Sequence, residues 1–251
     1  MTGLIAVEIP AGEAGITALW DRMPAALAGE QCLALVPADA PPAVRACFHL
    51  EAPDEGLEGI ALLVATSGST GTPRAVRCQP SALLAHPENT VHQWVLALPA
   101  SAMGGLKVIV RGFAGGLRPI GFDGALTTAL PRIAHAEHPA PLAISLVPTQ
   151  LAQCLRDPAA TKALAVFDHV LIGGAHLPEV IATRARDAGI PIATSYGATE
   201  TCGGCVIDGN PLPDVTVTIE ADSRIRLRGP MVTRGYRGDL LATQAAFDGD
   251  S

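Results

Sequence analysis

Aromatic residues are scarce in this chain: five Phe, two Tyr and two Trp make up 4% of its 251 residues. The core must then be filled mainly by Ala, Val, Leu and Ile, which account for most of a 49% hydrophobic fraction. Such a composition suits β-branched strands packed against helices rich in alanine and leucine. The length corresponds to one large domain or two small ones. We therefore expect an α/β fold.

Charged residues are also few, at 16%, and the formal net charge is −7. No cluster of basic residues reaches the density of a nucleic-acid-binding face, so nucleic acid is not an expected partner. No apolar run approaches the roughly 18 residues that a membrane-spanning helix requires. Residues 1–5 lack the basic start of a secretory signal. We expect a cytoplasmic protein without membrane insertion.

Metal or redox cysteine motifs are missing as well. Of the six cysteines, only Cys202 and Cys205 have Cys-x-x-Cys spacing. A zinc site would require a second pair or nearby histidines, and a redox motif would require a thioredoxin-like βαβ context. We expect all six cysteines to be structural residues or parts of a pocket wall.

The hydrophobic pattern that is present alternates between helix and strand. Helical spacing of apolar residues predicts helices at 12–29, 80–86, 149–155 and 178–188. Short apolar runs predict strands at 32–36, 60–65, 94–98, 144–147, 170–172 and 192–195. Residues 37–57 are rich in proline and acids and are expected to be irregular. This order predicts a mostly parallel sheet layered with helices.

The pattern changes near residue 215. Val215, Val217 and Ile219 alternate with polar residues, as do Ile225 and Leu227, which is typical of antiparallel strands. We therefore divide the chain into an α/β region at 1–212 and a small β subdomain of the same domain at 213–251.

The loop at residues 66–74 reads Thr-Ser-Gly-Ser-Thr-Gly-Thr-Pro-Arg and follows an apolar strand. Glycine lets a backbone approach a ligand closely, and hydroxyls with backbone N–H groups in such a turn bind phosphate oxygens. Arg74 adds a positive charge that can hold a phosphate through paired N–H groups. The loop is not a Walker A sequence, because G-x-x-x-x-G-K-[ST] is absent. These residues predict a phosphate site.

Three further segments follow this loop in the chain: Gly173–Ala175, Tyr196–Glu200, and Arg228–Pro230 with Thr233–Tyr236. Together and in this order they resemble the motifs of the adenylate-forming (acyl-CoA synthetase) superfamily, over roughly residues 60–240. The family usually has lysine where this chain has Arg74. The resemblance implies the large N-terminal domain of an enzyme that couples a carboxylic acid to ATP and passes the acyl group to coenzyme A.

The resemblance also implies a role for each matching residue. The phosphate loop would hold the β- and γ-phosphates of ATP with Thr66, Ser67, Gly68, Ser69, Thr70, Gly71 and Arg74. The adenine would lie among Gly173, Gly174, Ala175, Tyr196 and Gly197. Thr199 would contact the α-phosphate, and Glu200 would be the ligand of Mg²⁺, a hard carboxylate for a hard ion.

Within the superfamily the likeness is strongest to the o-succinylbenzoate–CoA ligases of menaquinone biosynthesis, carried by residues 145–151 and 200–206. The chain departs from them after Leu98-Pro99, where they typically have a histidine pair and this chain has Ser101-Ala102. The expected acyl-binding residues are Ser101, Lys107, Arg111, Gly203 and Gly204, with Lys107 or Arg111 facing a second carboxylate. Another aryl-, fatty- or malonyl-type acid stays open.

The family's ribose-binding aspartate and its C-terminal domain, which carries a catalytic lysine, would come after residue 251. Neither Lys107 nor Lys162 matches that lysine. We expect the chain to represent the N-terminal domain without the C-terminal one and to be incomplete as an enzyme by itself. A non-catalytic module that holds ATP or an adenylate is the alternative from another class, and a homodimer is compatible with the sequence.

Overall fold

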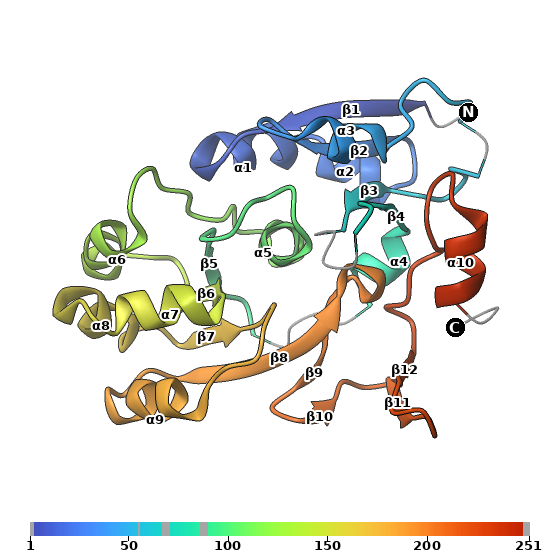
Figure 1. Ribbon diagram of the computed structural model, residues 1–251. Helices are drawn as coiled ribbons and strands as arrows, with labels where there is room; N and C mark the ends of the chain where they lie inside the picture. Colours follow the sequence, from blue (N-terminus) through green and yellow to red (C-terminus); the bar gives the residue numbers. More distant parts are fainter. Residues whose placement is uncertain (1–2, 55, 67–70, 86–89, 248–251) are drawn as a thin grey trace.

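The computed structural model describes residues 3–54, 56–66, 71–85 and 90–247 (Figure 1). Within them, the chain forms a four-stranded sheet, a six-stranded sheet and a two-stranded ribbon. Helix α5 (Met103–Ala114) lies between the two larger sheets, and other helices cover their outer faces. The predicted α/β fold with a small antiparallel region is confirmed.

The first sheet has the order β1-β2-β3-β4. Its strands are β1 (Leu4–Ile9), β2 (Cys32–Pro37), β3 (Leu62–Ala65) and β4 (Ala75–Cys78). The first three are parallel, and β4 runs antiparallel to β3. Leu33 and Leu35 of β2 face one hydrophobic cluster, whereas Cys32, Ala34 and Val36 face another. Both faces are therefore buried, which explains the unbroken apolar run in the sequence.

The second sheet has the order β10-β9-β8-β7-β6-β5. Its strands are β5 (Gln93–Val95), β6 (Leu142–Leu146), β7 (His169–Ile172), β8 (Ile192–Ala198), β9 (Gly203–Ile207) and β10 (Asn210–Pro211). Strands β5 to β8 are parallel, and β9 and β10 are antiparallel additions. The carboxyl ends of the parallel strands meet at one edge, where ligands bind in open α/β sheets.

Helices cover both faces of the second sheet. On one face, α5 packs against β5, β6 and α1 (Gly12–Trp20). On the other lie α6 (Leu126–His135), α7 (Pro148–Cys154), α8 (Pro158–Leu164) and α9 (Glu179–Asp187), whose apolar residues share one cluster with the strands (Figure 1). No helix among the described residues is long and apolar enough to cross a membrane.

Two predicted segments differ from the structure. The single helix expected at 12–29 is two helices, α1 and α2 (Met23–Leu27). Pro24 lies in the first turn of α2, and its ring would clash with the carbonyl of Trp20 in a continuous helix. The segment 37–57, expected to be irregular, contains the short helix α3 (Pro42–Ala46), which begins with a proline at a position where no N–H is needed.

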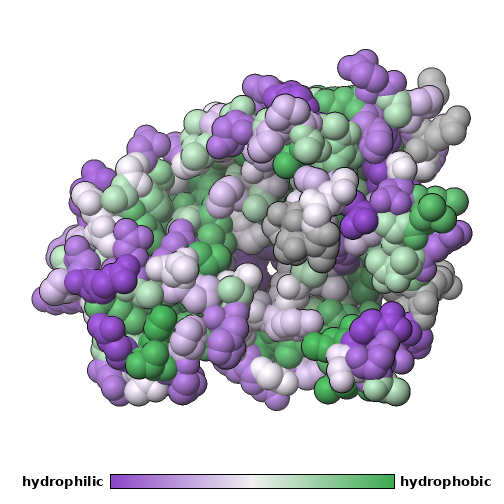
Figure 2. All heavy atoms as spheres, viewed as in Figure 1, coloured by the Kyte–Doolittle hydropathy of each residue, from purple (hydrophilic) through white to green (hydrophobic). Residues whose placement is uncertain are grey.

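The end of the described chain consists of a ribbon and a helix. Strands β11 (Thr216–Ile219) and β12 (Ile225–Arg228) pair antiparallel, as the alternation predicted. They are followed by α10 (Leu240–Ala246). Apolar side chains are exposed on both elements, with Ile219 74% and Leu241 80% accessible. Figure 2 shows this hydrophobic surface at the right and lower right of the molecule.

A buried arginine joins this end of the chain to the first sheet. Arg237 is 6% exposed. Its guanidinium donates to the carbonyl oxygens of Phe48 (2.9 Å), His49 (3.0 Å), Ala52 (3.2 Å) and Pro53 (3.3 Å). The planar guanidinium thus supplies hydrogen-bond donors to the backbone carbonyls of a connection that has no regular structure of its own.

Replacing Arg237 should destabilise the fold. In Arg237→Met the apolar stem is kept, but the carbonyl of buried Phe48 and three partly buried carbonyls lose their charged donor, so we expect the free energy of unfolding to fall by about 1.5–3 kcal/mol. Urea denaturation followed by circular dichroism measures the change. Arg234→Met is the matched control, because Arg234 is exposed and its contact with the Glu58 carbonyl is 3.4 Å long. A loss no larger than the control's would show that the fold does not depend on these bonds.

Candidate functional site

The phosphate loop connects two antiparallel strands, β3 and β4, and the second of these was not predicted. Its base is closed by Thr66, whose N–H donates to the Arg74 carbonyl at 2.8 Å and whose Oγ1 accepts from the Arg74 N–H at 3.1 Å. Gly71 has φ +122°, a conformation that favours glycine. The predicted residues Ser67, Gly68, Ser69 and Thr70 lie outside the described residues.

The segment at 233–237 lies beside β4 and brings a second motif to this loop. Arg77 N–H donates to the Gly235 carbonyl (2.9 Å), and Arg237 N–H donates to the Ala75 carbonyl (2.9 Å). The Thr233 N–H also donates to the Glu200 carbonyl at 2.9 Å. Three motifs that are far apart in the sequence therefore meet at one place.

Their side chains form a continuous network. The Tyr236 hydroxyl donates to Glu200 Oε1 at 2.7 Å, and the guanidinium carbon of Arg74 lies 5.4 Å from the centre of the Tyr236 ring. Arg74 Nε donates to Asp239 Oδ2 at 3.0 Å. Burial, and then the bond to Glu200, raise the pKa of Tyr236, so the phenol keeps its proton and remains a donor.

Asp239 is itself held in place, because it caps α10. Its Oδ1 accepts from the Ala242 N–H at 2.9 Å. That bond, followed by the bond to Arg74, lowers the pKa of Asp239, so the carboxylate stays ionised. The Thr243 hydroxyl links Asp239 to Tyr236, because it donates to the Asp239 carbonyl (2.8 Å) and accepts from the Tyr236 N–H (3.0 Å).

Glu200 is presented by a short, tightly hydrogen-bonded turn. It lies in the 3₁₀ helix η1 (Thr199–Thr201), which ends at Cys202 in the left-handed region with φ 48°. The Thr201 hydroxyl accepts from the Ala198 N–H (2.9 Å) and donates to the Gly203 carbonyl (2.8 Å). These bonds fix the turn, so Thr199 and Glu200 are carried on a defined backbone.

The oxygen atoms here suit magnesium rather than a transition metal. In the described part of the chain, no group of three His, Cys, Asp or Glu side chains could hold a metal by itself. Magnesium is commonly bound by one or two carboxylates together with substrate phosphates, and it does not need a complete protein cage. Glu200, with one oxygen fixed by Tyr236, fits that role beside a phosphate loop.

The expected adenine-binding residues follow two neighbouring strands. Gly173, Gly174 and Ala175 come directly after β7, and Tyr196 and Gly197 lie near the end of β8. A Cβ on Gly173 would lie 3.4 Å from the Ser195 carbonyl, which shows how close the two strand ends are. Tyr196 is 50% exposed. This edge of the sheet therefore offers an open aromatic face next to small residues, a surface suited to a flat base.

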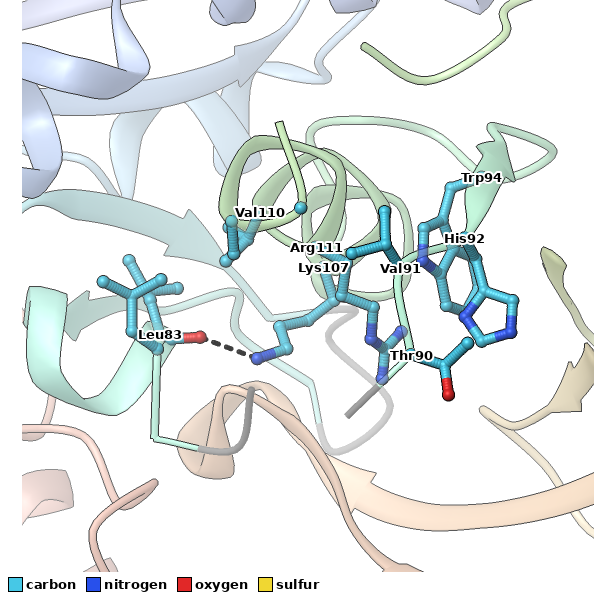
Figure 3. Close-up of a pocket in the computed structure, with 11 residues that line it drawn as sticks. Leu83, Thr90, Val91, His92, Trp94, Lys107, Val110 and Arg111 are labelled. Carbon is cyan, nitrogen blue, oxygen red and sulfur yellow. Dashed lines mark hydrogen bonds between the residues drawn. The ribbon is translucent and has the colours of Figure 1, made fainter. Parts of the chain in front are cut away.

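A cavity of about 160 Å³ lies beside α5 (Figure 3). Its lining includes Leu83, Trp94, Lys107, Val110 and Arg111. Lys107 is buried and donates from Nζ to the Leu83 carbonyl at 2.7 Å. The Arg111 guanidinium carbon lies 4.8 Å from the centre of the Trp94 ring. Two cations therefore face a largely apolar cavity.

The other expected acyl-binding residues are distributed unevenly around this cavity. Gly203 lies next to Lys107, because a Cβ there would be 3.0 Å from Lys107 Cγ. Gly204 instead packs against Ser195, and a Cβ there would be 1.9 Å from the Ser195 Oγ. Ser101 is buried just before α5 and is not part of the cavity lining. The structure thus places Lys107 and Arg111 at the cavity, whereas Gly203 lies against the Lys107 stem outside the cavity lining and Gly204 follows it on β9.

The six cysteines, expected to be structural residues or parts of a pocket wall, are all buried and free of disulfide bonds. Burial raises the pKa of Cys47 and of Cys154 to about 11 in each case. These two thiols are therefore protonated at neutral pH and poor nucleophiles.

The whole chain was compared with known proteins. Residues 23–237 match the protein family described as "AMP-binding enzyme". The probable 2-succinylbenzoate–CoA ligase of Mycobacterium tuberculosis strain H37Rv is 39% identical over 196 residues, which cover 73% of this chain and 50% of that protein. The 2-succinylbenzoate–CoA ligase of Enterococcus faecalis strain V583 is 27% identical over 223 residues, covering 77% and 46%.

The fold is also similar to solved structures. The o-succinylbenzoate coenzyme A synthetase of Bacillus subtilis, in complex with ATP and a magnesium ion, has a TM-score of 0.80 at 20% sequence identity. The match covers 99% of this chain and 65% of that one. The chain spans about half the length of the curated relatives that it matches.

Proposed function

Because the chain belongs to the AMP-binding enzyme family, we propose that it forms the ATP- and acid-binding part of an AMP-forming acid–CoA ligase that acts on o-succinylbenzoate. In this proposal ATP and the acid are substrates, Mg²⁺ accompanies the nucleotide, and coenzyme A receives the acyl group. The curated relatives named 2-succinylbenzoate–CoA ligase support the choice of acid.

The observation that carries the proposal is the meeting of Arg74, Tyr236 and Glu200 beside the phosphate loop. In adenylation, a carboxylate oxygen attacks the α-phosphorus of ATP and pyrophosphate leaves. Two anions approach each other, so the site must supply positive charge and aligned donors. Arg74 and the loop would hold the β- and γ-phosphates, and Thr199 the α-phosphate. Magnesium, held by Glu200, would neutralise charge on the phosphates.

The cavity beside α5 favours an aryl acid over a long fatty acid. A cavity of about 150 Å³ accommodates a benzene-sized ring, and this one has about 160 Å³. Its two cations, Lys107 and Arg111, suit an acid that carries a second carboxylate. A malonyl-type acid could pair with these cations but is too small to contact the apolar wall of the cavity.

Calorimetric titration of the chain tests the nucleotide site directly. We expect ATP with Mg²⁺ to bind, and binding to weaken when Mg²⁺ is removed with EDTA, because Glu200 then repels the phosphates. A folded chain that gives no heat with millimolar ATP would refute the proposal. The alternative function, a module that holds ATP without turnover, predicts the same binding but no pyrophosphate release when acid is added to the intact protein.

A further inference from the structure

We propose that Asp239 is a positioning residue for Arg74 and thereby sets the affinity of the site for the polyphosphate of ATP. The inference rests on the proposed function, because it takes Arg74 as a phosphate ligand. It concerns a carboxylate that no motif in the sequence marks, in a position that lies 165 residues beyond Arg74.

The guanidinium of Arg74 is held from two directions. Asp239 Oδ2 accepts from Nε at 3.0 Å, and Cζ lies over the Tyr236 ring, 5.4 Å from its centre. Nε is the inner nitrogen of the fork. A carboxylate bound there fixes the rotation of the head group, while the two outer nitrogens point along the side chain, where they can meet a phosphate through paired bonds.

This arrangement requires arginine. Lysine carries a single ammonium on a flexible stem and has no inner N–H that could be held separately from its ligand. In this pair, the Asp239 carboxylate therefore orients the Arg74 guanidinium, and the guanidinium binds the phosphates. Asp239 is itself held in position, because its side chain caps α10 and its carbonyl accepts a hydrogen bond from the Thr243 hydroxyl.

The direction in which ATP affinity changes when Asp239 is neutralised shows whether Asp239 orients Arg74 or acts only through its charge. Asp239 is an anion close to a proposed polyphosphate site, so Coulomb repulsion alone predicts that its neutralisation strengthens ATP binding. If Asp239 instead orients Arg74, neutralisation weakens ATP binding. AMP lacks the β- and γ-phosphates that Arg74 would contact, so its affinity should not depend on Asp239.

The experiment compares ATP and AMP binding to the chain by calorimetry, for wild type and for Asp239→Asn. Asparagine is as good a helix cap as aspartate, so α10 keeps its cap while the charge is lost. We expect the Kd for ATP to rise about fivefold, the upper range for a half-exposed ion pair, and the Kd for AMP to stay within about twofold. Asp222→Asn is the control, since Asp222 holds Arg224 Nε at 2.7 Å on the exposed ribbon.

The same substitution in an Arg74→Lys variant distinguishes the orientation of Arg74 from a general effect on folding. In Arg74→Lys, the change Asp239→Asn should have no further effect on ATP, because no Nε remains to be held. Equal losses for ATP and AMP, an equal loss in the Arg74→Lys background, or tighter ATP binding would each overturn the inference. Melting temperatures show whether each variant folds, and Asp239→Ser, another good cap, replaces Asp239→Asn if that variant does not. Wild type that binds neither nucleotide would instead overturn the proposed function itself.

Discussion

Glu200→Gln is expected to slow pyrophosphate release by the intact protein about 100- to 1000-fold, while binding of the acid changes by less than about twofold. The amide has the shape of the carboxylate, and its oxygen can still accept the bond that Tyr236 donates at 2.7 Å. What is lost is the negative charge that would hold magnesium at the phosphates. Charge stabilisation acts mainly on the transition state, so the rate should fall more than the affinity.

The measurement is pyrophosphate release with o-succinylbenzoate, ATP and varied Mg²⁺, together with acid binding by calorimetry. Glu220→Gln is a matched control, because Glu220 also accepts a bond at 2.7 Å, from Arg226 Nε, but lies directly after the ribbon strand β11. Wild-type rates in Glu200→Gln would show that Glu200 is not a metal ligand. A parallel loss of acid binding would show that the turn, rather than the charge, had been damaged.

The sequence predicted the motifs of this site but not the way in which they are joined. The phosphate loop, Tyr196–Glu200 and Thr233–Tyr236 were recognisable because each has an unusual local order of glycines and polar residues. The bond from Tyr236 to Glu200 was not, because it depends on how β4 aligns the segment 233–237. Asp239 was missed for a related reason, although an aspartate directly before Leu240 and Leu241 is a recognisable cap signal.

Strands with both faces buried were predicted from their apolar runs, and β11 and β12 from their alternation, whereas β4 and the edge strand β1 were not predicted. Strand β2 is apolar along its length because it lies inside the sheet. Strand β4 has only four residues, one of them Arg77, and its neighbours on the open side come from a segment far along the chain. Strand β1 lies at the sheet edge with most of its side chains partly exposed. Pairing with β3 and with the segment 233–237, rather than local preference, makes β4 a strand.

The cavity that we propose for the acid could not be located from sequence periodicity. Helix α5 is apolar on several sides because it lies between two sheets, so Lys107 and Arg111 looked like isolated charges in an apolar stretch. Lys107 is buried at the cavity (Figure 3). Gly203 of β9 lies against its stem. Only the packing of α5 against β9 brings the two residues together.

Lys107→Met should therefore act on the second carboxylate of the acid and little on the rest of the ligand. The test uses two stable acyl-adenylate analogues with a sulfamate in place of the phosphate. One carries o-succinylbenzoate, and the other carries the same acyl group without the benzoate carboxylate. A charge-assisted hydrogen bond in a buried site is worth about 1.5–3 kcal/mol, so we expect the affinity for the first analogue to fall about 10- to 100-fold.

Affinity for the second analogue should change by less than about threefold, because methionine keeps the apolar stem that packs against Gly203. Lys162→Met serves as the control in the same titrations, because Lys162, the chain's other lysine, is exposed on α8.

Equal losses for both analogues would mean that Lys107 supports the cavity wall and does not bind the second carboxylate of the acid. A selective loss in Arg111→Met, and none in Lys107→Met, would assign the carboxylate to the arginine stacked on Trp94. Because Lys107 lies deeper than Arg111 and away from water, its charge is the less screened of the two and should dominate the choice of acid.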